Sequence, residues 1–227
     1  MEAREILSPV ADPDIEILKL VLGPLETNCF ILGNRALQEA VVIDPSWSGQ
    51  IIAQEIERRR WKLTHVLITH AHMDHVGGCK ALTRQLPAPV ALHREDYELY
   101  QARGGASLFG FSIEPGPKPS IWLQHGMTLQ TAGLSFEVLH LPGHSAGHVG
   151  FYDRSRGWLF QGDVLFQGGI GRTDLPGQDH AALMASIRDH LLTLPDETRV
   201  FTGHGPDTTI RIERGTNPFL VGLGLSP

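Results

Sequence analysis

The sequence predicts an α/β (α+β) protein in which two β-sheets pack together and are covered by helices. Three observations predict this architecture: strand-like segments occur in both halves of the chain, helical segments come late in each half, and no fixed-period repeat is present. The 227 residues suffice for one sizeable core, so a single domain is expected over residues 15–227. Residues 1–14, which are acidic and contain two prolines, are expected to form a flexible N-terminal extension.

The first half of the chain contains four strand-like and two helical segments. Apolar runs bounded by turn residues such as Gly23 and Pro24 indicate strands. Apolar residues on one face of a segment indicate a helix. The predicted strands are 14–21, 27–32, 40–43 and 63–69, and the predicted helices are 50–60 and 76–85.

The second half follows a long irregular segment, residues 101–120, which contains four glycines and three prolines. This segment is either a connector or a lid that lines a substrate site with Phe109 and Phe111. Several strands in a row come after it, followed by an amphipathic helix. The predicted strands are 121–124, 128–130, 134–139, 148–152, 158–160 and 199–201, and the predicted helix is 180–194.

The composition excludes several classes of partner. The net charge is −6 and no basic run is present, so no nucleic-acid partner is expected. No apolar run approaches the ~18 residues that span a membrane, and the N-terminus lacks the features of a secretory signal. A cytoplasmic protein, monomeric or a small homo-oligomer, is therefore expected. The two cysteines, Cys29 and Cys79, are expected to be reduced.

The segment THAHMDHVGG, Thr69–Gly78, places four possible metal ligands in six positions: His70, His72, Asp74 and His75. Alternate residues of an extended chain point the same way, so His70 and His72 share a face if the preceding strand continues. Asp74 and His75 are adjacent in sequence, so they point apart or enter a turn. This geometry favours two pairs of ligands over a single four-ligand cage.

Three further candidates stand where an apolar strand meets a glycine-containing loop: His144 in LPGHSAGHVGF, Asp163 in LFQGDVLFQGG and His204 in FTGHGPD. Imidazole and carboxylate groups together suit zinc, iron or manganese. A site with three protein ligands keeps an open position for water, as catalytic sites do. One expected site contains His70, His72 and His144, a second contains Asp74, His75 and His204, and Asp163 bridges them.

These motifs carry a resemblance to a known family. HAHMDH at residues 70–75 matches the signature of the metallo-β-lactamase superfamily, and the later GH, GD and GH elements follow in the family's order. More narrowly, LPGHSAGHVGFY, GDVLFQGGIGRTD and TGHGPDTTIRIERGTNPF look like the glyoxalase II (hydroxyacylglutathione hydrolase) branch. The resemblance implies a four-layer αββα sandwich with metals at one edge of the sheets. It also implies that Asp44 supports the metal loop.

The resemblance is to the short, single-domain form of this branch. Longer glyoxalase II enzymes carry a C-terminal helical region that supplies part of the glutathione site, whereas this sequence ends soon after Asn217–Phe219. The resemblance therefore implies the hydrolytic centre and leaves the carrier of the acyl group open.

The resemblance implies a metal-dependent hydrolase that cleaves an acyl-glutathione such as S-lactoylglutathione, or a related thioester or ester. The nucleophile is a hydroxide that bridges two divalent ions, expected to be zinc, with iron or manganese as alternatives. Asp163 and Asp74 are the catalytic carboxylates, and Asp74 also orients the hydroxide. Arg172 is expected either to pair with a substrate carboxylate or to form a structural salt bridge. Asn28 and His180 are further candidate substrate contacts.

Two alternatives come from the same superfamily. The segment GRTD, Gly171–Asp174, also resembles mononuclear iron sulfur (persulfide) dioxygenases, which hold one iron with two histidines and an aspartate. His204 argues against that reading because it completes a second ligand set. A diiron redox scaffold is disfavoured because that branch usually carries glutamate where this chain has His72.

Overall fold

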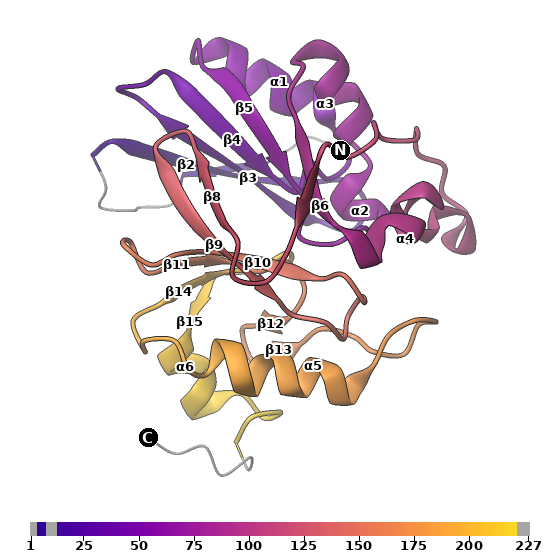
Figure 1. Cartoon of the computed structure of the whole chain (residues 1–227), viewed down its shortest axis with the longest axis vertical. Helices are drawn as coiled ribbons and strands as arrows, with labels where there is room; N and C mark the ends of the chain where they lie inside the picture. The colour runs from indigo at the N-terminus through magenta and orange to yellow at the C-terminus, as the bar shows by residue number, and fades with distance from the viewer. Residues whose placement is uncertain (1–3, 8–12, 222–227) are drawn as a thin grey trace.

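The computed structural model describes residues 4–7 and 13–221. The helices are α1 (Gly49–Arg58), α2 (Met73–Val76), α3 (Cys79–Gln85), α4 (Tyr97–Gln101), α5 (His180–Ser186), α6 (Ile210–Thr216), the 3-10 helices η1 (Arg94–Asp96) and η2 (Arg103–Phe109), and the π-helix η3 (Ile187–Leu191). Figure 1 shows two sheets face to face, with α1 and α3 covering one and α5 and α6 covering the other. The predicted αββα sandwich is confirmed.

Within the described residues, the first sheet has seven strands in sequence order: β1 (Arg4–Leu7), β2 (Ile15–Leu22), β3 (Thr27–Asn34), β4 (Glu39–Ile43), β5 (Lys62–Leu67), β6 (Val90–His93) and β7 (Ile121–Leu123). The pairs from β1 to β4 are antiparallel, and those from β4 to β7 are parallel. The carboxyl ends of β4 and β5 therefore meet at the same edge, where the loops with candidate ligands begin.

The second sheet has the strand order β15 (Thr208–Thr209), β14 (Arg199–Phe201), β11 (Trp158–Phe160), β10 (Val149–Asp153), β9 (Leu134–His140) and β8 (Thr128–Thr131), as the described part of the chain has it. Its pairs are antiparallel except β11 with β14. A separate small hairpin joins β12 (Leu165–Phe166) to β13 (Gly169–Ile170). β11 and β14 end side by side, so the loops that follow them lie together.

Side-chain alternation along the strands creates three apolar layers. In β2, Leu18 and Leu20 pack with Ile52 of α1, whereas Ile17 packs between the sheets. The layer between the sheets also holds Phe160, and a third layer lies between the second sheet and helices α5 and η3. Each large apolar side chain buried in these layers contributes roughly 1.5–3 kcal/mol relative to an exposed one.

Several boundaries differ from the predictions. The strand predicted over 63–69 ends at Leu67, and β6 was not predicted. The stretch predicted as irregular, 101–120, contains the 3-10 helix η2. β1 lies within the predicted N-terminal extension and pairs with β2, while residues 1–3 and 8–12 of that extension lie outside the described residues.

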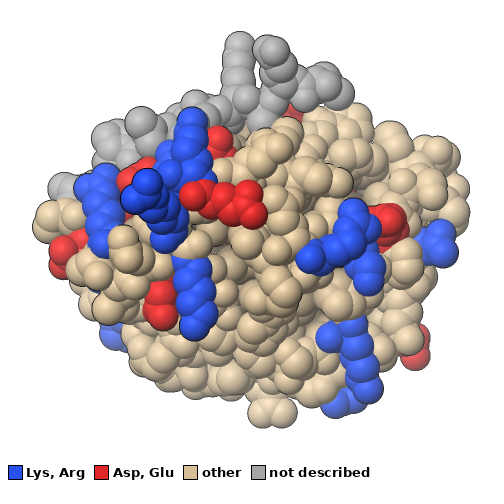
Figure 2. Space-filling model, turned by 90° about the horizontal axis from the view of Figure 1, so that it is seen from above, with Lys and Arg blue, Asp and Glu red and all other residues tan. Residues whose placement is uncertain are grey.

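Several charged side chains on the surface form ion pairs. At the C-terminal end of α1, Arg58 and the C-cap residue Arg59 both pair with Glu55, and Arg59 also pairs with Glu16. On the face shown in Figure 2, Lys and Arg side chains likewise stand beside Asp and Glu side chains, among large areas of other residues. None of the helices in the described ranges is both long and apolar enough to span a bilayer.

Candidate metal centre

The HAHMDH motif occupies the loop after β5 and the first turn of α2. Since β5 ends at Leu67, His70 and His72 lie in irregular backbone rather than on a continued strand, which corrects the local geometry predicted for them. His72 is the N-cap residue of α2, and Asp74 and His75 belong to the helix itself. The change from loop to helix turns the two pairs of side chains in different directions.

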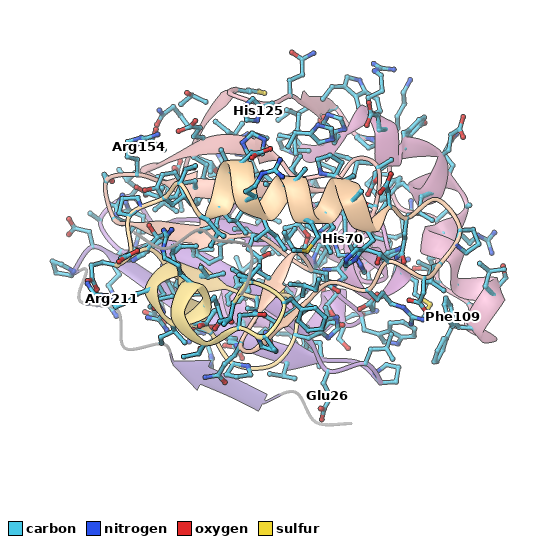
Figure 3. The ribbon with its side chains drawn as sticks, turned by 90° about the horizontal axis from the view of Figure 1, so that it is seen from below. Glu26, His70, Phe109, His125, Arg154 and Arg211 are labelled. Atoms are coloured by element: carbon cyan, nitrogen blue, oxygen red, sulfur yellow. The ribbon has the colours of Figure 1, made fainter. Side chains whose placement is uncertain are left out.

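The first pair meets His144 from the loop between β9 and β10. The potential ligand atoms of His70, His72 and His144 lie within 4.8 Å of one another. His72 Nδ1 is 2.9 Å from His144 Nε2. Figure 3 shows His70 near the middle of the molecule, and this side chain is fully buried. The structure therefore assembles the three histidines that the sequence analysis grouped together.

The second pair meets His204 from the loop after β14. The potential ligand atoms of Asp74, His75 and His204 also lie within 4.8 Å of one another. His204 Nε2 is 3.1 Å from Asp74 Oδ2, and His75 Nε2 is 3.5 Å from the same oxygen. This group also matches the one expected from the sequence.

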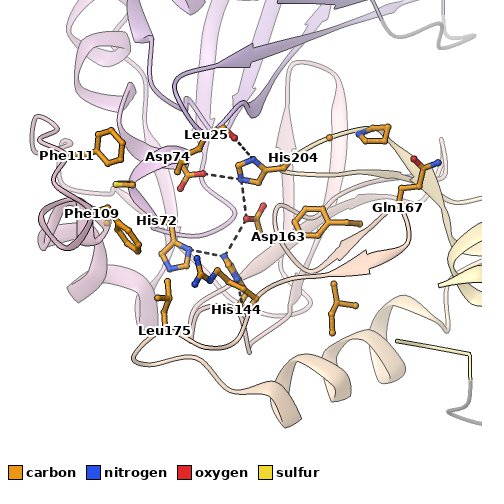
Figure 4. Close-up of a pocket in the computed structure, with 17 residues that line it drawn as sticks. Leu25, His72, Asp74, Phe109, Phe111, His144, Asp163, Gln167, Leu175 and His204 are labelled. Carbon is orange, nitrogen blue, oxygen red and sulfur yellow. Dashed lines mark hydrogen bonds and ion pairs between the residues drawn. The ribbon is translucent and has the colours of Figure 1, made fainter. Parts of the chain in front are cut away.

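Asp163, which follows β11, lies between the two groups (Figure 4). Its Oδ1 is 3.4 Å from His75 Nε2, and its Oδ2 is 3.4 Å from His204 Nε2. The same Oδ2 is 3.6 Å from His144 Nε2. One carboxylate therefore faces both histidine groups, and the whole arrangement suits two divalent ions.

Backbone carbonyls set the tautomer of two of these histidines. His144 donates its Nδ1–H to the carbonyl of Arg172 over 2.9 Å. His204 donates its Nδ1–H to the carbonyl of Leu25 over 3.0 Å. Each bond places a proton on Nδ1, so that Nε2, which faces Asp163, is the nitrogen that can ligate a metal once it carries no proton.

Asp44 orients two more histidines from behind. Its Oδ2 accepts the Nδ1–H of His75 over 2.9 Å and the hydroxyl of Thr69 over 2.7 Å. Its Oδ1 accepts the backbone N–H of Thr69 over 2.7 Å. Because the Thr69 hydroxyl donates to Asp44, it accepts from His70 Nδ1, 3.1 Å away. In both rings, Nε2 is therefore the nitrogen that remains available to ligate a metal.

The charges of the site favour a cation. Burial raises the pKa of Asp74, but the neighbouring His75 and His204 lower it further, to about 2. Burial lowers the pKa of His204, but Asp163 and Asp74 raise it to about 10. Burial is also the main cause that lowers the pKa of His72 to about 3, so this imidazole is neutral and able to ligate.

Sequence reasoning missed Asp96, a buried carboxylate that joins the two ligand loops. Its Oδ2 accepts the Ala71 N–H over 2.7 Å and the Ser145 hydroxyl over 2.8 Å. Its Oδ1 accepts the Gly147 N–H over 2.6 Å. Asp96 stands outside every ligand motif, and its partners are distant in sequence, so no local signal marked it.

Two more residues hold the acidic side chains in place. Thr27, also missed, donates its hydroxyl to Asp74 Oδ2 over 2.9 Å. His148 Nε2 accepts the backbone N–H of Asp163 over 3.2 Å, and its ring stacks on His70 with centroids 4.5 Å apart. His148 therefore supports Asp163 and His70 and does not belong to either group of potential ligands.

A cavity of about 720 Å³ opens beside the candidate metal centre. Figure 4 shows Phe109 and Phe111 on one side of it and Gln167 on the other. The residues that line it include Leu25, His72, Met73, Asp74, Phe109, Phe111, His144, Asp163, Phe166, Gln167, Ile170, Arg172, Leu175 and His204. Segment 101–120 thus contributes Phe109 and Phe111 to a cavity wall, as expected if it lines a substrate site.

The other predicted substrate contacts differ from one another. Arg172 lines the cavity, but its guanidinium forms a salt bridge with Asp174. Asn28 lies outside the lining, because its amide donates to the carbonyls of Thr202 and Gly205. His180 also lies outside it, with Nδ1 3.2 Å from the hydroxyl of Thr173. The structure therefore brings Arg172 to the cavity, but neither Asn28 nor His180.

The sequence is similar to curated bacterial proteins over most of its length. Hydroxyacylglutathione hydrolase GloC of Haemophilus influenzae is 38% identical over 91% of this chain and 98% of its own. Probable metallo-hydrolase YqgX of Bacillus subtilis is 37% identical with the same coverage.

Solved structures show the same fold. BLEG-1 B3 metallo-beta-lactamase has a TM-score of 0.85 and 40% identity, covering 90% of this chain and 99% of its own. TTHA1623, solved in a di-iron-bound form, has a TM-score of 0.80 and 43% identity, with 89% and 99% covered. ETHE1 from Myxococcus xanthus has a TM-score of 0.71 and 27% identity, with 98% and 85% covered.

The family model described as Metallo-beta-lactamase superfamily matches residues 22–204, which contain every candidate ligand. Together with the fold and the relatives, this match shows that the chain belongs to the metallo-beta-lactamase superfamily.

Proposed function

We propose that this protein is a metal-dependent hydrolase, similar to glyoxalase II, that cleaves an acyl-glutathione or a related thioester or ester. The observation that carries the proposal is the position of Asp163, whose two oxygens face both histidine groups at 3.4–3.6 Å. The name of the relative GloC, a hydroxyacylglutathione hydrolase, supports the reaction class.

We propose that two divalent ions occupy the centre. His70, His72 and His144 would hold one, Asp74, His75 and His204 would hold the other, and Asp163 would contact both. Zinc is the expected metal, with iron or manganese as alternatives, and the relative TTHA1623 has been solved in a di-iron-bound form.

The chemistry of the donors supports this assignment. His70 Nε2, His75 Nε2 and Asp163 Oδ1 are buried and have no hydrogen-bond partner. A buried polar atom without a partner costs about 1–3 kcal/mol, and the two ions together would satisfy all three atoms. A structural role alone does not account for three such atoms facing one another.

The protein's own residues would prepare the reaction. When bound, the ions would make water acidic enough to ionise near neutral pH and would polarise the substrate carbonyl. Asp74, held by the Thr27 hydroxyl, would orient the nucleophile. The apolar cavity wall would exclude bulk water from the reacting carbonyl. A thiolate leaving group needs little help from a general acid.

Turnover assays test the proposal directly. Protein loaded with zinc, iron or manganese is incubated with S-lactoylglutathione and a panel of thioesters and esters. We expect hydrolysis that a chelator abolishes and added metal restores, with two ions per chain by elemental analysis. Metal-dependent turnover on none of these substrates would refute the proposal.

An iron-dependent persulfide dioxygenase is the second candidate, favoured by Gly171–Asp174, the segment that resembles such enzymes and reaches the cavity through Arg172. Oxygen uptake with glutathione persulfide, with a single iron per chain, is the result that would support it. The complete second group of Asp74, His75 and His204 favours the hydrolase.

A further inference from the structure

The cavity wall is apolar away from the candidate metal residues. Its apolar side chains include Leu25, Phe109, Phe111, Phe166, Ile170 and Leu175. Among the described residues that line the cavity and lie outside the metal centre, Gln167 and Arg172 alone have polar side chains. Such a wall binds substrates mainly by removing apolar surface from water.

The single cationic side chain of this wall is already paired. Arg172 Nε is 2.8 Å from one oxygen of Asp174, and Nη2 is 2.9 Å from the other. Asp174 therefore competes with a substrate carboxylate for this guanidinium, and the guanidinium is also about half exposed to water, which weakens its attraction for any anion. Glutathione carries two carboxylates, and coenzyme A carries several phosphate charges. The wall therefore provides little that would recognise either carrier.

The aromatic side of the wall is firmly attached to the metal loop. Gly104 has φ +61°, and a Cβ there would overlap the backbone of Met73, so η2 packs directly on the start of α2. The ring of Phe111 packs edge-on against Trp47, with centroids 5.2 Å apart. Phe109 is 46% exposed and Leu25 is 44% exposed, so apolar groups also stand at the mouth.

We propose that the cavity selects thioesters whose acyl group is a medium-length alkyl or aryl chain and whose thiol part carries no carboxylate or phosphate group. This inference rests on the proposed hydrolase function and specifies its substrate class. In the reaction, water replaces the thiol at the acyl carbon: a C–O bond forms, the C–S bond breaks, and the products are a carboxylate, a thiol and a proton. The Phe109 side of the cavity would hold the chain.

The expected selectivity follows from area burial. Each methylene moved from water into the cavity contributes ~0.8 kcal/mol, which is about fourfold in kcat/KM, until the cavity is filled. A charged carrier should lower kcat/KM relative to a neutral carrier with the same acyl group, because its carboxylates lose water without gaining a free cation.

The test uses the metal-loaded enzyme and two matched substrate series. Acetyl, butyryl and hexanoyl groups are attached either to neutral N-acetylcysteamine or to glutathione. We expect kcat/KM to rise along each series and to be higher for N-acetylcysteamine at each chain length. A flat series, or a preference for S-lactoylglutathione over every neutral thioester, overturns the inference while leaving the hydrolase function intact.

Binding without turnover separates this inference from the proposed function. The thioethers S-hexyl-N-acetylcysteamine and S-hexylglutathione cannot be hydrolysed, and calorimetry measures their affinities. Tighter binding of the neutral thioether supports the inference even if no thioester is cleaved. Equal affinity, or tighter binding of the glutathione derivative, contradicts it.

Two neighbouring side chains of η2 provide a matched pair of variants. Phe109 lines the cavity, whereas Leu108 does not and is 75% exposed. Phe109→Ala should lower kcat/KM for the hexanoyl thioester about tenfold and for the acetyl thioester less than threefold. Leu108→Ala should leave both within twofold. Equal effects of the two substitutions, or an equal loss on both substrates, would contradict the assignment of the chain to this wall.

Discussion

Replacing Asp44 with asparagine should weaken metal binding while keeping the fold. Asp44 has φ +52°, a left-handed conformation that asparagine tolerates well, so the backbone need not move. The new amide would face Thr69 Oγ1 and His75 Nδ1, which both donate to the aspartate. To accept a hydrogen bond from the amide, His75 must move its proton from Nδ1 to Nε2. Thr69 must likewise accept from the amide and donate its hydroxyl to His70 Nδ1, so the proton of His70 also moves to Nε2.

The magnitude follows from the loss of two correctly protonated ligands. Removing such a hydrogen-bond partner typically lowers metal affinity by about 10–100-fold, or roughly 1.4–2.7 kcal/mol. Competition with a chromophoric chelator, at a fixed pH, measures the dissociation constants and the number of ions bound. We expect weaker binding of both ions in Asp44→Asn, with His75 and His70 otherwise in place.

Asp153→Asn is the matched control. Asp153 is as buried as Asp44, but it caps a turn by accepting from Ser155 and Arg156 and contacts none of the candidate ligands. Unfolding of both metal-free variants by denaturant separates a loss of affinity from a loss of fold. Wild-type affinity in Asp44→Asn, or the same loss in Asp153→Asn, would refute the reasoning.

Three further predictions concern the surroundings of the site. Asp96→Asn should lower the free energy of unfolding by about 1–3 kcal/mol, because either orientation of its amide places the NH2 group against a backbone N–H donor, that of Ala71 or that of Gly147; no change in denaturant midpoint would contradict this. Gly203→Ala should abolish binding of at least one ion in elemental analysis, because its Cβ would overlap Asp163 Oδ1. The control Gly215→Ala, which has open space around the new Cβ, should bind both ions. Equal metal content in the two variants would contradict this prediction. The pKa of Glu16 is raised by burial but lowered further by two arginines, so its contribution to stability is present above its ordinary pKa and disappears as the pH falls below the lowered value. Comparing Glu16→Gln with the wild type by denaturant unfolding should therefore show a difference at pH 7 that vanishes at pH 2; a constant difference would argue against the ion pairs.

Local patterns predicted the strands well where both faces are buried. The apolar segments of β2, β3 and β4 alternate between two packed layers, which is what their sequences indicated. β6 was missed because it has only four residues and follows Pro87 and Pro89 closely. η2 was missed because Gly104 and Gly105 have non-helical dihedral angles within it, and a glycine-rich segment is usually interpreted as a loop.

The candidate ligands could be predicted because they lie in short motifs at the ends of strands. The residues that hold the ligand loops in place, such as Asp96 and Thr27, could not be predicted. Asp96 binds Ala71, 25 residues away, and Gly147, 51 residues away. Thr27 reaches Asp74 across 47 residues. Such contacts exist only once segments distant in sequence have packed together, and the contact of Asp96 with Gly147 also joins the two sheets, so no property of the neighbouring sequence indicates them.

The division of the candidate ligands between the sheets has a mechanical consequence. His70, His72, Asp74 and His75 follow a strand of the first sheet, whereas His144, Asp163 and His204 follow strands of the second. Metal ions bound by ligands from both sheets would cross-link the two halves of the sandwich. Loading the ions should then slow hydrogen exchange at the strand ends of both sheets together. The residues that would bind the ions would thus also stabilise the packing of the two sheets.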